Sequence, residues 1–366
     1  MQWKGQQVGP IGIDLGARRV RAIQLRKRQE GHEVVAASAV ETDAGAGGDE
    51  DALRSQLCKV LAEGKFVGKC AATCLPSADV RVKNLRLPDM PAAELESAAI
   101  FEAQERFRDL GDDVVIRTLR AGRVGGGGQG EGQQEMILLA ASRGAIEARL
   151  KLLTDVGLTV VGLEPAAMAF FRPFERFLRR ESDADRSSAF VDVGRRGSRI
   201  IVARGSDIAF LKYCPVGGQA FDEAVAKALS IPPQRAGAVR QQLFEEDAGS
   251  GAPVDSAAVM EALQPGLDQL GKELGLCLRY FAVTFRGERP EYITCGGGEV
   301  ISAPLVERLS QATQIPVQVG DAFRGVEGEG AWRDSVAGTS LSEWTTALGS
   351  ALRTASVGAR KAQVVR

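Results

Sequence analysis

Two stretches of the chain combine an aspartate with a glycine in a short turn between β-type residues. The first turn is Asp14-Leu15-Gly16 and the second is Asp192-Val193-Gly194. Each pattern predicts a β-hairpin that carries one carboxylate and several backbone N–H groups at its tip. Glycine N–H groups can approach phosphate oxygens because no Cβ intervenes, and paired aspartates can hold Mg²⁺ through water. The alternative is that each aspartate caps its own turn, although a motif found in two matching halves makes that alternative less attractive.

Two further motifs could complete a nucleotide site. Glu164 lies beside a proline at the predicted start of a helix, where a carboxylate could position an attacking water near a γ-phosphate. Gly296, Gly297 and Gly298 follow a predicted strand and would let the backbone lie flat against adenine and ribose. The repeated hairpin predicts two similar half-folds that face one another, and it raises the question of whether a nucleotide lies between them.

The composition argues against several classes of function. The 366 residues include 46 Lys or Arg and 47 Asp or Glu, so the chain lacks the basic field that drives binding to nucleic acid. No apolar run approaches the ~20 residues of a transmembrane helix, and the first residues do not resemble a signal peptide, so we expect a cytoplasmic protein without direct membrane insertion. His32 is the only histidine, which argues against Ser-His triads and histidine metal sites. The six cysteines lack metal-ligand spacing and are expected to be buried, reduced thiols.

Periodic patterns between the motifs predict an α/β fold. A strand at 33–40, an amphipathic helix at 51–64 and a buried strand at 69–75 follow the first hairpin, and together they describe half of a sheet-and-helix domain. The pattern then changes to strands flanked by two helices. This change predicts a small inserted α+β subdomain at about 83–157.

The length suits two domains of ordinary size. Domain 1 is expected at 1–180, and domain 2 at 187–352 with a helical subdomain at about 226–285. The glycine run at 125–128 lacks side chains to pack, so we expect a disordered hairpin tip there and not a phosphate loop. Residues 353–366 are expected to form a flexible basic tail.

In their order along the chain, these motifs resemble those of the actin-like ATPase superfamily. The Asp14 turn is similar to its first phosphate loop, and the Asp192 turn to its second. Residues 164–167 resemble its first connecting helix, and residues 294–298 its adenosine loop. The resemblance implies an actin-like, ribonuclease-H-like α/β fold of two domains that binds ATP and Mg²⁺.

The middle of the chain narrows this resemblance to the PilM family of type IV pilus assembly proteins, which is related to the cell-division protein FtsA. The segments that carry it are 75–76, 85–88, 98–104, 138–143, 158–165 and 272–285. The resemblance spans about residues 9–322. It implies a cytoplasmic scaffold, peripheral to the inner membrane through its partner. That partner would be the N-terminal cytoplasmic peptide of a PilN-like inner-membrane protein, and self-association is a further option.

The resemblance assigns residues to each site. The nucleotide-binding set comprises Asp14, Gly16, Ala17, Arg18, Arg19, Asp192, Gly194, Ser198, Gly217, Gly218, Arg240, Gly296, Gly297 and Gly298. Asp14 and Asp192 would hold Mg²⁺ through water, and Glu164 is the candidate for water positioning. A peptide groove is expected between the first domain and the small subdomain, where an extended peptide would gain main-chain hydrogen bonds and apolar pockets. Its lining residues would be Val82, Leu85, Leu87, Ile100, Phe101 and Phe107.

The phosphate loops depart from the superfamily pattern. In the first loop, Ala17, Arg18 and Arg19 replace the hydroxyl residues that are usual in relatives. The two arginines are either phosphate ligands or solvated turn residues, and the same choice applies to Arg195 and Arg196 in the second loop. The loss of hydroxyl donors favours a protein that holds nucleotide over one that hydrolyses it.

Two more departures concern the adenosine side of the expected site. Gly237 occupies the place of an acidic ribose-binding residue, and Glu299 that of a small residue. The alternative functions are an active ATPase or sugar kinase of the same superfamily, and an FtsA-like filament-forming protein. The tail has too few large apolar residues for the amphipathic membrane helix that FtsA carries.

Overall fold

The structure is a computed structural model in which the chain divides into two compact units. It describes residues 8–42, 50–111, 113–124, 132–242, 256–286, 289–299, 303–328, 332 and 340–353. The first unit comprises Met1–Val80, Ser142–Arg176 and Asp321–Arg366, and the second comprises Arg81–Ala141 and Phe177–Gly320. The expected disordered tip at 125–128 and the tail residues 354–366 lie outside the described ranges. No helix in the described part of the chain combines the length and the apolar character needed to cross a membrane.

The first unit is built on a six-stranded sheet with the order β14-β3-β2-β1-β4-β8. Its strands are β1 (Val8–Leu15), β2 (Arg19–Lys27), β3 (His32–Glu41), β4 (Cys70–Leu75), β8 (Thr159–Pro165) and β14 (Val326–Glu327). Strands β1, β2 and β3 form an antiparallel meander, whereas β4 and β8 run parallel to β1. Strand β14 pairs with β3 and is too short to give a periodic signal in the sequence.

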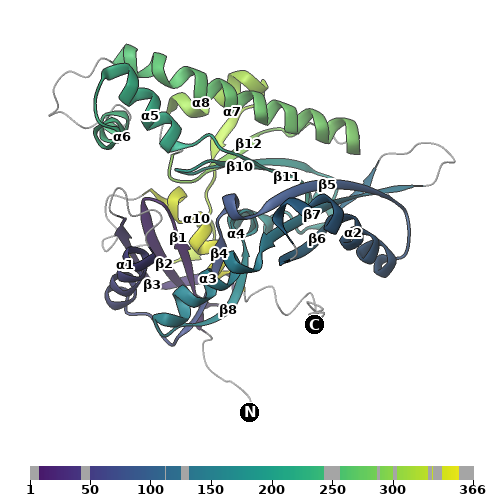
Figure 1. Cartoon of the computed structure of the whole chain (residues 1–366), viewed down its shortest axis with the longest axis horizontal. Coiled ribbons are helices and arrows are strands. Elements are labelled where there is room, and N and C mark those ends of the chain that lie inside the picture. Colours follow the sequence, from purple (N-terminus) through teal and green to yellow (C-terminus); the bar gives the residue numbers. More distant parts are fainter. Residues whose placement is uncertain are drawn as a thin grey trace. The chain divides into compact units, whose positions relative to one another are not determined.

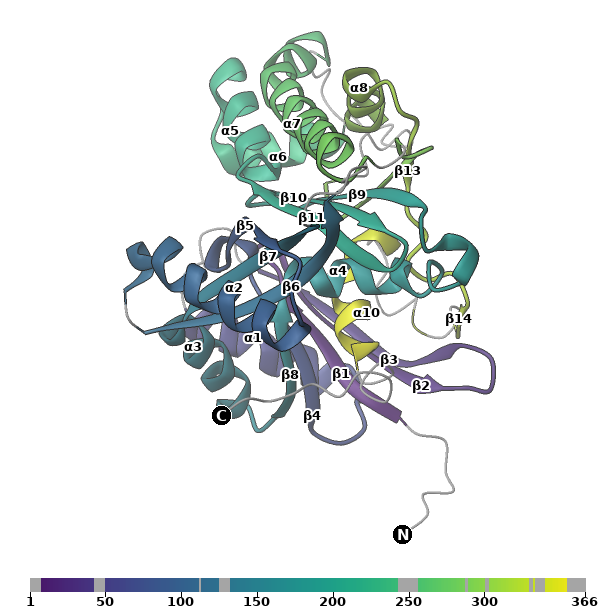
Figure 2. The same ribbon diagram turned by 90° about the vertical axis from the view of Figure 1, so that its right-hand side faces the viewer.

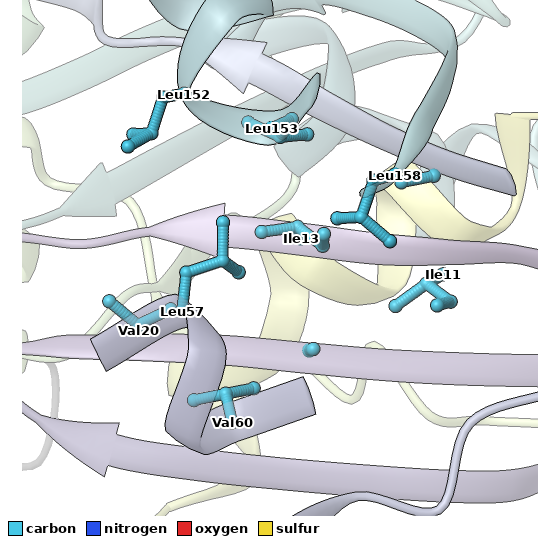
Figure 3. Packing of buried hydrophobic residues seen from close by; sticks show 10 residues of the cluster. Ile11, Ile13, Val20, Leu57, Val60, Leu152, Leu153 and Leu158 are labelled. Atoms are coloured by element: carbon cyan, nitrogen blue, oxygen red, sulfur yellow. The ribbon is translucent and has the colours of Figure 1, made fainter. Parts of the chain in front are cut away.

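Helices cover both faces of this sheet (Figure 2). They are α1 (Glu50–Glu63), α3 (Arg143–Asp155), α4 (Ala166–Glu175) and α10 (Thr345–Ala351), which follows the 3₁₀ helix η5 (Leu341–Trp344). On one face, Ile11 and Ile13 pack with Leu57 of α1 and Leu153 of α3 (Figure 3). Helix α3, expected in the small inserted subdomain, therefore belongs to the core of the first unit.

Helix α10 lies on the opposite face, in backbone contact with β1. A Cβ at Gly12 would lie less than 3.0 Å from backbone atoms of Ala347 and Ala351. On its other side, α10 packs equally closely on α4, because a Cβ at Gly349 would collide with the carbonyl oxygen of Ala169. Glycine is required at both positions because any side chain would push these elements apart.

The second unit repeats the design of the first. Its five-stranded sheet has the order β11-β10-β9-β12-β13. The strands are β9 (Ser187–Val193), β10 (Ser198–Arg204), β11 (Asp207–Cys214), β12 (Ile293–Gly296) and β13 (Val317–Val319). Strands β9 to β11 form an antiparallel meander, and β12 and β13 run parallel to β9. The order and directions match those of β3-β2-β1-β4-β8, so the two similar half-folds predicted from the hairpins are confirmed.

A group of helices packs with this second sheet (Figure 1). They are α5 (Gly218–Leu229), α6 (Pro233–Gln242), α7 (Ser256–Phe285) and α8 (Ala303–Thr313). Helix α7 buries Leu263, Leu267, Leu270 and Leu274, which recur at the three- and four-residue spacing of one helix face. This spacing explains why a 30-residue helix forms here despite Pro265.

A three-stranded sheet with the order β5-β7-β6 also belongs to the second unit. Its strands are β5 (Arg81–Pro88), β6 (Val114–Val124) and β7 (Gln133–Ser142). Helix α2 (Ala92–Arg106) covers one face, where Leu95 and Ala99 pack with Met136 and Leu138 of β7. The remaining 3₁₀ helices are η1 (Ser77–Asp79), η2 (Arg108–Leu110) and η3 (Glu181–Asp183).

Polar contacts tie the other face of the three-stranded sheet to α7. The fully buried Glu135 of β7 accepts hydrogen bonds from Arg86 at 2.9 Å and from Asn84 at 3.2 Å. Tyr280 of α7 donates to the same carboxylate, and Arg86 also donates to Thr284 at 2.8 Å. A buried carboxylate is costly unless it is paired, so these bonds hold the sheet against the helix.

Candidate functional site

The two aspartate hairpins have the same register. In the first, Asp14 of β1 lies directly opposite Arg21 of β2. In the second, Asp192 of β9 lies directly opposite Arg199 of β10. Both turns contain four residues, and in both the aspartate precedes its arginine by seven positions. The second unit therefore reproduces the cross-strand aspartate–arginine pair of the first.

In the first hairpin, the arginine is shared between two carboxylates. Arg21 has one terminal nitrogen 3.7 Å from Asp14 Oδ2, and its other terminal nitrogen pairs with Glu343 of η5. Arg19 also reaches Glu343, at 3.3 Å, and bonds Glu41 at 2.7 Å. Arg19 is thus held by carboxylates of its own unit. Glu343 pairs with both Arg19 and Arg21, and it links them to η5.

The tip of the first hairpin needs its glycine. A Cβ at Gly16 would lie 2.7 Å from the carbonyl oxygen of Arg19, closer than real Cβ contacts allow. Ala17 and Arg18 complete the tip and are partly exposed. The tip is compact because the chain turns back on itself within four residues.

In the second hairpin, the aspartate is buried. The side chain of Asp192 is 2% exposed, against 19% for Asp14, and it forms an ion pair with Arg199. Gly297 follows β12 with a φ of +99°, and a Cβ there would collide with Asp192 Oδ1. This glycine therefore packs directly on the aspartate, which only glycine can do in this conformation.

Backbone hydrogen bonds join the second hairpin to its neighbours. The N–H groups of Gly218 and Gln219, in the first turn of α5, donate to the carbonyl oxygens of Gly194 at 3.1 Å and Arg195 at 2.7 Å. The N–H group of Glu299 donates to the carbonyl oxygen of Val193 at 3.1 Å. The hairpin, the start of α5 and the loop at 297–299 after β12 thus form one hydrogen-bonded assembly.

Gly217 and Ser198 contribute to this assembly in different ways. A Cβ at Gly217 would clash with the carbonyl oxygen of Gly194, so this glycine permits the close approach of α5. The Ser198 hydroxyl is fully buried and donates to the carbonyl oxygen of Val216 at 2.6 Å. The structure thus assigns this predicted phosphate donor to a backbone contact. Gly296 ends β12, and Gly298 follows Gly297 in the loop after this strand.

Arg240, predicted as a nucleotide ligand, lies in a buried ion network. Its guanidinium donates to Asp222 at 2.8 Å and to Glu299 at 2.6 Å, and Arg195 bonds Asp222 at 2.5 Å. Burial alone would lower the pKa of Arg240, but Glu299 and Asp222 outweigh it and raise the pKa. The Glu299 carboxylate lies against Gly218, where a Cβ would collide with it. The Glu299 carboxylate therefore lies next to the first residue of α5.

Glu164, the candidate for water positioning, is also paired. Arg172 of α4 forms an ion pair with its carboxylate and donates to the carbonyl oxygen of Gly349 at 2.8 Å. Arg353 lies 3.9 Å from the same carboxylate. In this structure Glu164 therefore joins β8, α4 and the segment after α10, and its carboxylate is engaged by arginines instead of being open to a water.

The six predicted groove residues divide into two groups. Leu85 and Phe107 lie in the core between α2 and the three-stranded sheet, because both point inward with Leu95 and Ala99. This burial corrects the prediction that they line a groove, and Leu87 packs against the same core while Val82 is half-buried. Only Ile100 and Phe101 of α2 are exposed, with exposed fractions of 36% and 67%.

The cysteines also differ from their predicted burial. Cys58 and Cys70 are exposed, whereas Cys74, Cys214, Cys277 and Cys295 are buried. Burial raises the pKa of the Cys295 thiol to about 12, and the charge of neighbouring Asp192 adds to the shift. None of the six is in a disulfide.

Sequence reasoning missed the arginines that face the aspartates. The equal spacing from Asp14 to Arg21 and from Asp192 to Arg199 was the available signal, because positions that face each other across a hairpin are fixed by turn length. Glu343 gave no local signal because its partner Arg21 lies 322 positions away in the chain.

The repeated half-folds and their hairpins define the class as that of actin-like ATPase folds, and two solved structures support this. The ethanolamine utilization protein EutJ from Carboxydothermus hydrogenoformans is 15% identical with a TM-score of 0.55, over 96% of this chain and 92% of that chain. MreB5 of Spiroplasma citri bound to ADP is 12% identical with a TM-score of 0.54, over 95% and 97% of the two chains. The predicted α/β actin-like fold class is therefore confirmed.

The chain belongs to the family described as type IV pilus assembly protein PilM, whose sequence profile matches residues 12–355. A chain of a PilM–PilN type IV pilus biogenesis complex is 21% identical to it, with a TM-score of 0.77 over 94% of this chain and 98% of that chain. Among proteins with curated functions, none matches this chain. The family resemblance stated from the sequence is thereby confirmed.

Proposed function

We propose that this chain is a cytoplasmic scaffold of a type IV pilus assembly machine that binds the N-terminal cytoplasmic peptide of a PilN-like inner-membrane protein. The observation that carries the proposal is the exposed pair Ile100 and Phe101 on α2, in a chain of the PilM family. Large apolar side chains exposed next to each other mark candidate interaction sites. The related chain solved in a PilM–PilN complex supports the choice of partner.

The three-stranded sheet on which α2 packs offers main-chain partners for a peptide. Its order makes β5 an edge strand, paired with β7 on one side, and helix α2 packs on the same sheet. An extended peptide can add to a sheet edge through main-chain hydrogen bonds while its side chains enter apolar contacts. Ile100 and Phe101 would provide those contacts.

The charge of α2 fits the same partner. Glu94, Glu96 and Glu105 are exposed on the helix that carries the apolar pair. Cytoplasmic segments next to a membrane span carry an excess of Lys and Arg. A short basic and apolar peptide from an inner-membrane protein would therefore complement this surface in charge as well as in hydrophobicity.

The second part of the proposal is that the chain holds a nucleotide, with ATP as the expected form. The hairpin, the start of α5 and the adenosine loop of the second unit provide the glycine-rich backbone that such a ligand requires. Three observations oppose sustained hydrolysis: Glu164 is held by arginines, the Ser198 hydroxyl bonds Val216, and the first tip lacks a hydroxyl at Ala17. The proposed role is a nucleotide-holding scaffold and at most a weak ATPase.

The test of the partner is a titration of the full chain against a fluorescent peptide from the cytoplasmic N-terminus of the PilN-like protein. Phe101→Ser is expected to weaken binding by about tenfold or more, because a buried aromatic anchor contributes about 2 kcal/mol or more at such contacts. The control is Val319→Ser, which removes another exposed apolar side chain of the second unit, 54% exposed, and should leave the affinity unchanged. Equal affinities for the wild type and Phe101→Ser would contradict the assigned surface, and no binding by the wild type would contradict the partner.

A further inference from the structure

The arginines that face the two hairpin aspartates bear on the metal ion expected at this kind of site. A magnesium ion held through water requires carboxylate oxygens that are open to its hydration shell, in nearly octahedral geometry. The ion also supplies positive charge to the phosphates of a nucleotide. Both requirements can be compared with the surroundings of Asp14 and Asp192.

At the first hairpin, a guanidinium occupies the neighbourhood of the carboxylate. Arg21 lies opposite Asp14 in the register and 3.7 Å from its Oδ2 atom. The arginine is itself buried and is fixed from its other side by Glu343, so it cannot swing away without leaving that carboxylate unpaired. A divalent cation next to Asp14 would be repelled by this fixed charge.

At the second hairpin, the fit is poorer still. One oxygen of Asp192 pairs with Arg199, and the other faces the backbone of Gly297. The carboxylate is 2% exposed, which leaves no room for a shell of water between it and a metal ion. Across the residues that the structure describes, no group of three or more His, Cys, Asp or Glu side chains is placed to hold a metal. The residues present therefore do not fit the expected Mg²⁺.

We propose that Arg199 takes the place of the divalent cation, so that the second unit binds the phosphates of a nucleotide without Mg²⁺. A guanidinium has a permanent charge and several N–H donors, and it can pair with a carboxylate and a phosphate at the same time. The same register places one such group in each hairpin, which an isolated surface arginine would not explain. The inference rests on the proposed nucleotide binding and deepens it by naming the metal-free nucleotide as the ligand.

The experiment is a calorimetric titration of the full chain with ATP in two buffers, one with excess Mg²⁺ and one with EDTA. The dissociation constants are expected to agree within about threefold, or to favour the EDTA buffer. An affinity that falls by about tenfold or more in EDTA overturns the inference while leaving the proposed nucleotide binding intact. No binding in either buffer overturns the proposed nucleotide binding and the inference with it, and the peptide titration still tests the scaffold role separately.

Variants of Arg199 identify the group responsible. Arg199→Met should weaken ATP binding in EDTA by about tenfold, whereas Arg199→Lys, which keeps the charge, should lose less. The double variant Asp192→Asn with Arg199→Met removes both charges, so it avoids an unpaired buried aspartate and should fold even if the single variant does not. It too should bind ATP about tenfold more weakly in EDTA, and wild-type affinity in the folded double variant overturns the role of Arg199.

A matched control lies on the same strand. Arg204 ends β10, remote from the turn, and pairs at 2.5 Å with Asp185, which precedes β9. Arg204→Met should leave the ATP affinity unchanged in both buffers. A loss equal to that of Arg199→Met would show that overall charge, and not the hairpin position, carries the effect, and would overturn the inference.

Discussion

The hairpins β1–β2 and β9–β10 share a register, a turn length and an aspartate–arginine pair, but their surroundings differ. Asp14 keeps a 19% exposed side chain, and its arginine is shared with Glu343. Asp192 is 2% exposed, and its hairpin is hydrogen-bonded to the start of α5 and to Glu299 in the loop after β12. In both hairpins the local sequence pattern determines the aspartate–arginine pair. Segments distant in sequence determine how far the aspartate is buried.

The strands behind the two hairpins differ in the same way. Two positions before Asp14 lies Gly12, against which the backbone of α10 packs. Two positions before Asp192 lies Phe190, a large buried side chain. The first hairpin is therefore supported by direct backbone packing, and the second by side chains and by its hydrogen-bonded neighbours.

The largest expected effect is that of Gly12→Ala. The new Cβ would lie 2.2 Å and 2.3 Å from backbone atoms of α10, so the cost should exceed that of ordinary overpacking and reach about 4 kcal/mol or more. The urea denaturation midpoint, followed by circular dichroism, should fall accordingly. Gly144→Ala in α3 is the control, because open space surrounds that position, and it should raise the midpoint slightly. An unchanged midpoint for Gly12→Ala would contradict the packing of α10 on β1.

The next effect separates the two aspartates. Asp192→Ala should destabilise the protein by about 2–4 kcal/mol, because it leaves Arg199 without its buried carboxylate. Asp14→Ala should cost less than about 1 kcal/mol, because Asp14 is partly exposed and Arg21 keeps Glu343. Denaturant unfolding of both variants checks the order. Equal losses would mean that the two hairpins are equally closed.

A smaller effect is expected for Glu343→Gln. The amide keeps the acceptor that caps η5 through the N–H group of Ser340, but it removes the charge that holds Arg19 and Arg21. A loss of about 1–2 kcal/mol should follow from breaking this partly buried pairing. Glu41→Gln, with its 74% exposed carboxylate, should cost less than about 0.5 kcal/mol. If both variants had the same stability, Glu343 would not organise the first hairpin.

The smallest effect is one of thiol reactivity, which reports how closed the second hairpin is without altering it. Cys58 and Cys70 are exposed and should react with iodoacetamide at pH 8. Cys295 lies beside the second hairpin, and burial raises its pKa to about 12, so it should stay protonated and unlabelled. Mass spectrometry of the labelled peptides measures each rate. Labelling of Cys295 as fast as Cys58 would show that the second hairpin opens readily.

Much of the fold was predictable because it follows from local patterns. The two hairpins, the repeated half-folds and α2 follow from strand alternation, turn residues and helical spacing. The assignment of α3 to the first unit was not predictable. It depends on the packing of Leu152 and Leu153 against residues distant in sequence, such as Ile11. The two-residue strand β14 was missed for lack of any periodicity.

The candidate site was predictable in its motifs but not in its chemistry. The aspartates and glycines could be found from the sequence, but the ion pairs that engage Glu164 and Arg240 could not. Arg240 bonds Glu299, which lies 59 positions away, so the pairing depends on tertiary packing. The sequence likewise could not tell that Phe101 is exposed and Phe107 is buried, because the two residues are of the same type.

We also propose that nucleotide bound to the second unit strengthens the binding of the partner peptide. The route is contiguous within that unit, because β10 pairs with β11, and β11 packs beside the three-stranded sheet. The Arg86–Glu135–Tyr280 cluster also fixes that sheet to α7. Binding at the hairpin can thus stabilise the sheet that carries α2.

The most direct test is the affinity of the full chain for the fluorescent PilN-like peptide, measured with and without saturating ATP. We expect ATP to tighten peptide binding by about fivefold or more, the lower range of ordinary coupling between sites. By reciprocity, the peptide should tighten ATP binding by the same factor. Equal peptide affinities with and without ATP, in a protein shown to bind both ligands, would contradict the proposed coupling between the two sites.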